Sequence, residues 1–168
     1  MRKLIKIAHT LGAVGLLGTM VTLLVVLGVL PEPAEDLNSY ALLTDLVDRL
    51  ARWLLLPSLT ITLVSGLLAI SQGPSYHSAG WAWMKLATGV TMFEGTLLTV
   101  QGPLQREAEL TRQYLAGAAE MEALSGSFGA VANCILVLAG VAVVNVVLGV
   151  WRPRFSRRSS GSPEVAEQ

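Results

Sequence analysis

The chain has 168 residues, of which 52% are hydrophobic and 14% are charged, and its formal net charge is zero. Soluble domains usually contain about 25% charged residues, so this composition predicts a membrane protein whose main partner is the lipid bilayer. The neutral balance, without a basic stripe carrying aromatic residues, argues against nucleic acid as a partner. A single cysteine, Cys134, excludes an intrachain disulfide and a cluster of thiolate ligands.

The first predicted helix covers about residues 4–30. Its uncharged run from Ile7 to Leu30 has 24 residues, which exceeds the apolar core of a cleavable signal peptide and is long enough to cross a bilayer. His9 and Gly12 begin a series at three- and four-residue spacing, which places them on one helical face. We expect this face to look into the protein.

The second predicted helix covers about residues 39–71 and begins after an acidic connection that contains prolines. Its first turns carry two charged pairs in the favourable acid-first order at four-residue spacing, Asp45 with Arg49 and Asp48 with Arg52. These charges indicate a helical extension outside the membrane. The following sequence is apolar, and Pro57 is expected to kink the helix there.

The third predicted helix, about residues 80–101, is an apolar run that contains both Lys85 and Glu94. A charge within a membrane is costly unless it is paired, neutral or next to water, so Glu94 is a candidate functional residue. If Glu94 points inward, we expect it to meet hydroxyl groups of neighbouring helices, namely those of Thr19, Thr22, Ser58 or Thr60. A separate extramembrane helical segment is expected over residues 104–122.

The fourth predicted helix covers about residues 124–151, and a basic tail follows, in which residues 156–168 are expected to be disordered. Together these elements predict an all-α fold with one domain over residues 1–155. We expect an antiparallel four-helix bundle in a bacterial inner membrane, with helical extensions on the non-cytoplasmic side. Eight lysines and arginines fall on the side of the termini and four on the other side, so both termini are expected in the cytoplasm.

Three segments carry a resemblance to known proteins: IKIAHTLGAVGLLGTM, LLLPSLTITLVSGLLAI and WAWMKLATGVTMFEGTLLTVQGPLQR. They look like an uncharacterised bacterial family of four-helix membrane proteins. They are more distantly similar to HemJ-type protoporphyrinogen oxidases and CopD-type copper-resistance proteins. The resemblance covers most of residues 4–112 and implies a cofactor, haem b or a copper ion. By it His9 would carry over as a ligand and Lys85 as a second polar residue of the site, whereas no second intramembrane histidine carries over.

Two hypotheses for the function therefore stay open, and no catalytic residue is identified. In the first, the chain is a redox or cofactor-associated protein in which His9 and Lys85 face one cavity near the cytoplasmic surface, with His9 and His77 as candidate metal ligands. In the second, the chain is a non-enzymatic membrane subunit or small permease in which Glu94 serves as a polar relay or an interhelical hydrogen-bonding residue. The second hypothesis includes association with further copies of the chain or with another membrane protein.

Overall fold

A computed structural model describes residues 2–72, 80–124 and 127–151, and this part of the chain is helical without strands. The segments in chain order are α1 (Arg2–Gly28), α2 (Leu37–Leu50), the π-helical η1 (Ala51–Leu55), α3 (Leu56–Ser71), α5 (Gly80–Thr96), the π-helical η2 (Leu97–Gln101), α6 (Gly102–Leu115), the short 3₁₀ helix η3 (Met121–Ala123) and α7 (Gly129–Trp151). Four long helices result, because α2, η1 and α3 follow one another without a break, as do α5, η2 and α6.

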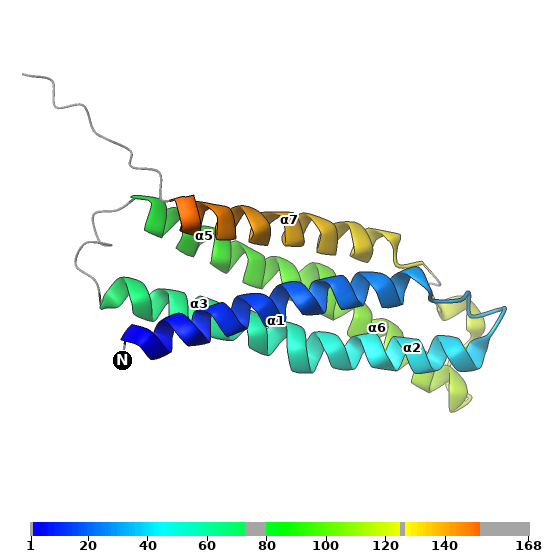
Figure 1. Cartoon of the computed structure of the whole chain (residues 1–168). Helices are drawn as coiled ribbons and strands as arrows, with labels where there is room; N and C mark the ends of the chain where they lie inside the picture. Colours follow the sequence, from blue (N-terminus) through cyan, green and yellow to red (C-terminus); the bar gives the residue numbers. More distant parts are fainter. Residues whose placement is uncertain (1, 73–79, 125–126, 152–168) are drawn as a thin grey trace, which may run out of the picture.

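The long helices lie side by side along most of their length (Figure 1). Helix α1 packs against α3 and α7, and α5 packs against the same two helices. Helices α2 and α6 pack against each other and form one end of the molecule, whereas the beginning of α1 and the end of α7 lie at the opposite end (Figure 1). The elements that carry His9 and Glu94, α1 and α5, are thus flanked by the same pair of helices.

In each of the two long helices that are built from three segments, a proline lies just after the π-helical segment. Pro57 lies in the first turn of α3, and Pro103 lies in the first turn of α6. Proline has no N–H, and inside an α-helix its ring collides with the carbonyl four residues earlier. The widened turns remove this conflict: the N–H of Leu56 bonds to Ala51 and that of Gly102 to Leu97, each five residues back. Both prolines are therefore accommodated within a continuous helix.

The observed helix ends differ from the expected ones at several places. The third helix was expected to end near Gln101, with a separate segment over residues 104–122, but α6 continues directly from α5 to Leu115. The reason is that Gly102 keeps the right-handed helical conformation and Pro103 follows it at a position that needs no N–H partner. The chain then turns through Gly117, whose φ of 72° is favourable for glycine. The last helix starts at Gly129 instead of residue 124.

Three of the long helices are long and apolar enough to cross a membrane: Lys3–Gly28, Leu37–Ser71 and Gly129–Val147. The expected third span, residues 80–101, is not among them, because Lys85, Glu94 and several glycines and threonines make it less apolar. Large apolar side chains cover the outside of the molecule, including Trp53 at 71% and Leu98 at 77% exposure. Soluble monomers rarely expose so much contiguous apolar surface. This surface therefore fits a membrane protein.

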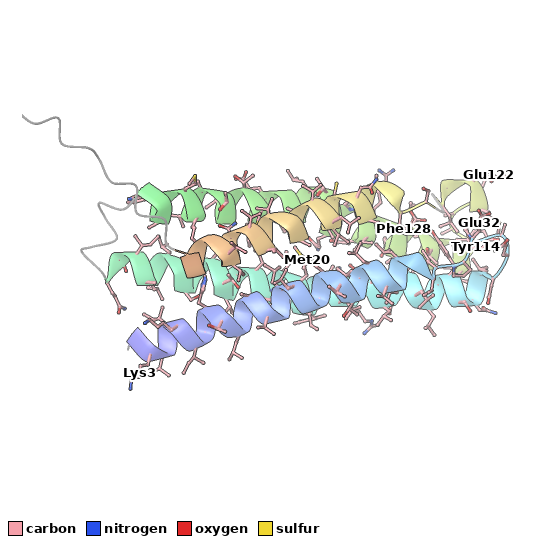
Figure 2. The ribbon with its side chains drawn as sticks, turned by 45° about the horizontal axis from the view of Figure 1, so that its top comes forward. Lys3, Met20, Glu32, Tyr114, Glu122 and Phe128 are labelled. Atoms are coloured by element: carbon pink, nitrogen blue, oxygen red, sulfur yellow. The ribbon has the colours of Figure 1, made fainter. Side chains whose placement is uncertain are left out.

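The apolar core runs along the centre of the molecule, where Met20 lies between the helices with 1% of its surface exposed (Figure 2). Other fully buried members come from α1, η1, α3, η2 and α7, namely Leu23, Leu55, Leu59, Val100 and Ile135. Charged side chains gather at the ends: Lys3 projects from one end, and Glu32 and Glu122 lie at the other (Figure 2). The core thus separates two polar ends, as expected for a protein that meets water on both sides of an apolar layer.

The start of α2 has a side-chain cap. The carboxylate of Asp36 accepts a hydrogen bond from the backbone N–H of Ser39 at 3.1 Å, which satisfies one of the free donors of the first helical turn. Hydrogen bonds from the side chain and the backbone of Ser39 lower the pKa of Asp36 below its ordinary value. The charged form of Asp36 is therefore favoured at this helix start, where the helix dipole also favours a negative charge.

Candidate functional site

His9 is half-buried on the face of α1 that meets α3. Its Nδ1 atom lies 2.9 Å from the backbone oxygen of Thr62 and 3.1 Å from the hydroxyl oxygen of Ser65. A carbonyl oxygen can only accept a hydrogen bond, so Nδ1 must carry the proton. The Ser65 hydroxyl can also accept, because it donates its own proton to the Ile61 carbonyl at 2.6 Å. The neutral imidazole then keeps its free electron pair on Nε2.

The inward face expected for the first helix is consistent with this contact. The helices approach closely here, because a Cβ atom on the buried Gly12 would overlap the Thr62 hydroxyl and lie 3.0 Å from the Ser58 carbonyl oxygen. His9 lies one turn before Gly12, so the same close approach brings its imidazole within hydrogen-bonding distance of α3. The histidine therefore has a structural role in the α1–α3 contact, whatever else its Nε2 atom does.

Lys85 is half-buried on α5, and its ammonium group forms no hydrogen bond or ion pair with any residue that the structure describes, although its backbone carbonyl accepts a hydrogen bond from Thr88. One turn further on, the Thr88 hydroxyl lies 3.0 Å from the side-chain oxygen of Asn145 and links α5 to α7. The amide nitrogen of Asn145 donates to the Val141 carbonyl, so both polar atoms of this side chain are used. The structure shows no hydrogen bond between His9 and Lys85 over the described ranges, and their shared cavity stays a prediction.

His77, the other candidate metal ligand, lies outside the described residues. Within the described ranges, no group of three or more histidine, cysteine, aspartate or glutamate side chains is arranged to hold a metal ion. A copper ion held only by protein side chains needs several such ligands, whereas haem iron can be held by one proximal histidine. His9 alone could therefore serve as the protein ligand of a haem iron.

Glu94 lies on the exposed side of α5, so the inward position for which hydroxyl partners on neighbouring helices were expected is not the one observed. Exposed positions of α5 and η2 recur at three- and four-residue spacing and form one outer stripe, which consists of Trp83, Met84, Ala87, Val90, Thr91, Glu94, Leu98 and Thr99. Glu94 forms no hydrogen bond or ion pair with any described residue. Three of its expected hydroxyl partners, Thr19, Thr22 and Thr60, donate instead to carbonyls of their own helices. The carboxylate of Glu94 therefore faces away from the other helices of the chain and toward the surroundings of the protein.

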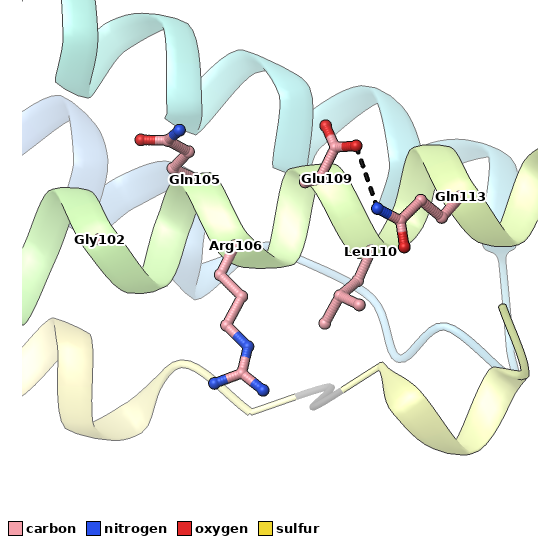
Figure 3. Close-up of a pocket in the computed structure, with 6 residues that line it drawn as sticks. All are labelled: Gly102, Gln105, Arg106, Glu109, Leu110 and Gln113. Carbon is pink, nitrogen blue, oxygen red and sulfur yellow. Dashed lines mark hydrogen bonds between the residues drawn. The ribbon is translucent and has the colours of Figure 1, made fainter.

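Two shallow grooves lie near α6. One is a space of about 420 Å³ along the outer face of α6, where Glu109 accepts a hydrogen bond from Gln113 and Arg106 projects toward the beginning of α7 (Figure 3). The other, of about 310 Å³, lies between α6 and the start of α7, with Arg106, Glu107 and Phe128 in its wall. Both lie at the end of the molecule opposite the beginning of α1. Neither includes His9, Lys85 or Glu94.

Sequence reasoning missed a polar cluster between α2 and α6. The hydroxyl of the fully buried Tyr40 donates to the carboxylate of Glu107 at 2.6 Å, and Glu107 is only 5% exposed. Further along α2, the carboxylate of Asp48 is 3.3 Å from Arg52, a pair that the sequence predicts, and 3.6 Å from Arg112 on α6, a contact that it does not. One signal could have indicated this contact: on each helix, polar residues recur at helical spacing beside small or apolar ones. These stripes consist of Tyr40, Thr44, Val47 and Asp48 on α2 and of Leu104, Glu107, Ala108 and Thr111 on α6.

Comparison with protein-family models, with characterised proteins and with solved structures finds no match for this chain. The functional proposal therefore rests on the geometry of the chain's own residues.

Proposed function

We propose that the chain is a non-enzymatic membrane subunit that associates with other membrane helices through the outer face of α5. In this proposal its four long helices form an antiparallel bundle across a bacterial inner membrane. The α2–α6 end faces away from the cytoplasm and the termini face the cytoplasm, as the distribution of lysines and arginines favours. A cysteine introduced at Ser160 should then be protected from an impermeant reagent added outside intact cells, and its labelling there would contradict this orientation.

The observation that supports the proposal is the outward position of Glu94. The residue lies fourteen positions after Gly80 and seven before Gln101, or about 21 Å and about 10 Å along the helix. The hydrocarbon layer is about 30 Å thick, so Glu94 is well inside it if α5 spans the bilayer. An acidic residue at the centre of a span costs about 2.5–3.5 kcal/mol on insertion scales. A partner that satisfies the carboxyl group removes much of this cost.

Other properties of α5 also fit a helix that packs against another protein within the membrane. Within the described residues, the long helix formed by α5, η2 and α6 is not apolar enough to count as a span by composition, yet α3 and α7 flank α5 on both sides. Its outer stripe contains the small Ala87 and the hydroxyl of Thr91, residue types that are enriched where membrane helices pack together. The described exposed positions of α3 and α7 also include small and polar residues, such as Thr60 and Gly140, but none of them is charged. The outer face of α5 therefore differs from theirs by the carboxyl group of Glu94.

Photo-crosslinking tests this proposal. A photoreactive residue at Leu98, one turn beyond Glu94, should give an adduct heavier than the chain alone in intact membranes. Val137 on α7 is the matched control: it is 67% exposed against 77% for Leu98. It also lies at a similar depth, because its neighbour Leu138 contacts Gly95. Equal labelling of lipid at both positions, without a protein adduct at Leu98, would rule the subunit proposal out.

One observation favours a second candidate function, a haem-associated protein in which His9 would hold the iron. The hydrogen bonds of Nδ1 to Thr62 and Ser65 fix the ring and leave Nε2 free to bind iron, an arrangement that is usual for metal-binding histidines. Haem bound there would supply electron transfer. His9 would hold the iron, and Lys85 would be the positive charge available for a propionate.

In this second case, the purified protein should show a Soret absorption band. His9→Ala should abolish the band, Lys85→Ala should weaken it, and Glu94→Gln should leave it unchanged. Helical content by circular dichroism should stay constant in all three variants, which separates loss of haem from loss of the fold. A band that persists in His9→Ala would exclude His9 as the ligand.

A further inference from the structure

Arg106 differs from the other arginines at the α2–α6 end of the molecule. Arg49, Arg52 and Arg112 each form ion pairs with carboxylates of α2 or α6. Arg106 is exposed on α6, and its guanidinium forms no hydrogen bond or ion pair with any residue that the structure describes. Its five N–H donors are therefore available to a ligand.

The side chain of Arg106 projects toward the start of α7 (Figure 3) and lines the groove of about 310 Å³ between α6 and α7. Much of the remaining wall is apolar, with Leu110 on α6 and with Phe128 and Val131 at the start of α7. The volume is at the lower end of the usual range for ligand pockets. A guanidinium group beside an apolar wall suits a ligand that has an anionic group attached to an apolar body.

The groove lies where the apolar part of the molecule ends. Of its lining residues, Pro103 directly follows η2, and Val131 lies in the first turn of α7, whose apolar span begins at Gly129. The charged positions of α6 begin at Arg106, one turn beyond Pro103. In a bilayer this is the level of the lipid headgroups, just outside the hydrocarbon layer. Basic pockets between membrane helices at this level are typical binding sites for lipid phosphate groups.

Glu107 adds a second charge to the wall of the groove. Its carboxylate is only 5% exposed and is held in place by the hydrogen bond from Tyr40 at 2.6 Å. A purely anionic headgroup would be attracted by Arg106 and repelled by Glu107. A zwitterionic headgroup instead presents a negative phosphate and a positive ammonium group, so that each charge of the groove meets its opposite.

We propose that this groove binds the headgroup of a phospholipid of the ethanolamine type, with the phosphate on Arg106 and the ammonium group toward Glu107. The planar guanidinium donates two parallel hydrogen bonds to the phosphate oxygens, a geometry that lysine cannot supply. The apolar side chains of Phe128 and Val131 then lie beside the part of the lipid that enters the hydrocarbon layer. Lipid binding here requires that the chain lies in a bilayer, but it does not require a partner on the outer face of α5.

Native mass spectrometry of the full chain in detergent tests this site with two lipids that share the same acyl chains, a phosphatidylethanolamine and a phosphatidylglycerol. The unaltered chain should bind the ethanolamine lipid more tightly. Arg106→Gln should weaken that binding about tenfold, because the phosphate loses a charged donor. Arg49→Gln is the matched control, since it removes another exposed arginine from the same end and should leave lipid binding unchanged. Helical content by circular dichroism should be equal in both variants.

Glu107→Gln tests the second charge of the groove. The amide keeps an oxygen that accepts from Tyr40 but carries no negative charge, so the preference for ethanolamine over glycerol should disappear. Equal loss of lipid in Arg106→Gln and Arg49→Gln, or equal binding of the two lipids by the unaltered chain, would overturn the proposal. Displacement of the lipid by inorganic phosphate would also overturn it, because the groove would then be a site for soluble anions. None of these outcomes depends on cross-linking at Leu98, so lipid binding and the subunit proposal stand or fall separately.

Discussion

Replacing Gly12 by alanine is expected to lower the stability of the protein by about 1–3 kcal/mol, which is the usual range for overpacking a well-packed contact. A Cβ atom at this position would overlap the Thr62 hydroxyl and approach the Ser58 carbonyl oxygen and the Thr62 nitrogen at 3.0 Å each. The two backbone atoms belong to α3 and cannot move without shifting the helix. The hydroxyl is held as well, because it donates to the Ser58 carbonyl at 2.7 Å.

Gly18→Ala is the matched control for this prediction. Gly18 lies on the same helix and is exposed, and an added Cβ atom there meets nothing within 4 Å. Alanine is also the better helix former, so this change should leave the melting temperature in detergent unchanged or raise it slightly. A second readout is available at His9, whose imidazole signal should shift in Gly12→Ala as α1 moves away from Thr62. Equal melting temperatures for the two variants would show that α1 and α3 do not pack as closely as described.

The sequence was sufficient to predict the helical character of the chain and three segments that are long and apolar enough to cross a membrane. Long uncharged runs such as Ile7–Leu30 cannot leave their backbone groups unpaired in hydrocarbon, so they must be helical. The spacing of His9 and Gly12 also predicted a common inward face. The partner could not be predicted, because the contact depends on which helix supplies acceptors at that depth, and Thr62 and Ser65 are more than fifty residues away.

The orientation of α5 was harder to predict, for a physical reason. In a soluble helix, the polar face points outward, and the contrast between faces gives the direction. For a helix in lipid the surroundings are as apolar as the core, so sequence contrast does not distinguish its two faces, and the direction of a residue such as Glu94 depends on how neighbouring helices pack. Helical periodicity places Thr91, Glu94 and Leu98 on one face. It could not tell whether that face meets α3 and α7 or the surroundings.

The continuity of the helix from α5 through η2 to α6 was hard to predict for a different reason. Gly102 and Pro103 together usually mark a helix end, and the charged residues after them look like a separate surface helix. A single widened turn, η2, places Pro103 where its missing N–H is harmless, and the helix runs on. Because η1 does the same before Pro57 and the two widened turns contact each other, α2 and α6 leave the apolar region side by side. That pairing places Tyr40 opposite Glu107.

Tyr40→Phe is expected to destabilise the α2–α6 end by about 1.5–3 kcal/mol, the range for a hydrogen bond to a charged group. The substitution removes the hydroxyl that donates to Glu107 at 2.6 Å and leaves a carboxylate of 5% exposure without that donor. Tyr114→Phe on α6 is the control, since the Tyr114 side chain is only half-buried and its hydroxyl forms no hydrogen bond with the described residues. Denaturant unfolding followed by circular dichroism should show a lower midpoint for Tyr40→Phe alone.

A double substitution then separates the hydrogen bond from general packing. In Tyr40→Phe the buried carboxylate of Glu107 loses the hydrogen bond from Tyr40, so adding Glu107→Leu should recover part of the lost stability. Replacing both partners of a buried hydrogen bond by apolar groups can be nearly neutral, whereas removing one partner takes that bond from the other. The two changes should therefore be strongly non-additive, with the double variant more stable than Tyr40→Phe. Additive losses would mean that Tyr40 and Glu107 contribute independently, and that the α2–α6 end is held by apolar contacts and by the Asp48–Arg112 pair instead.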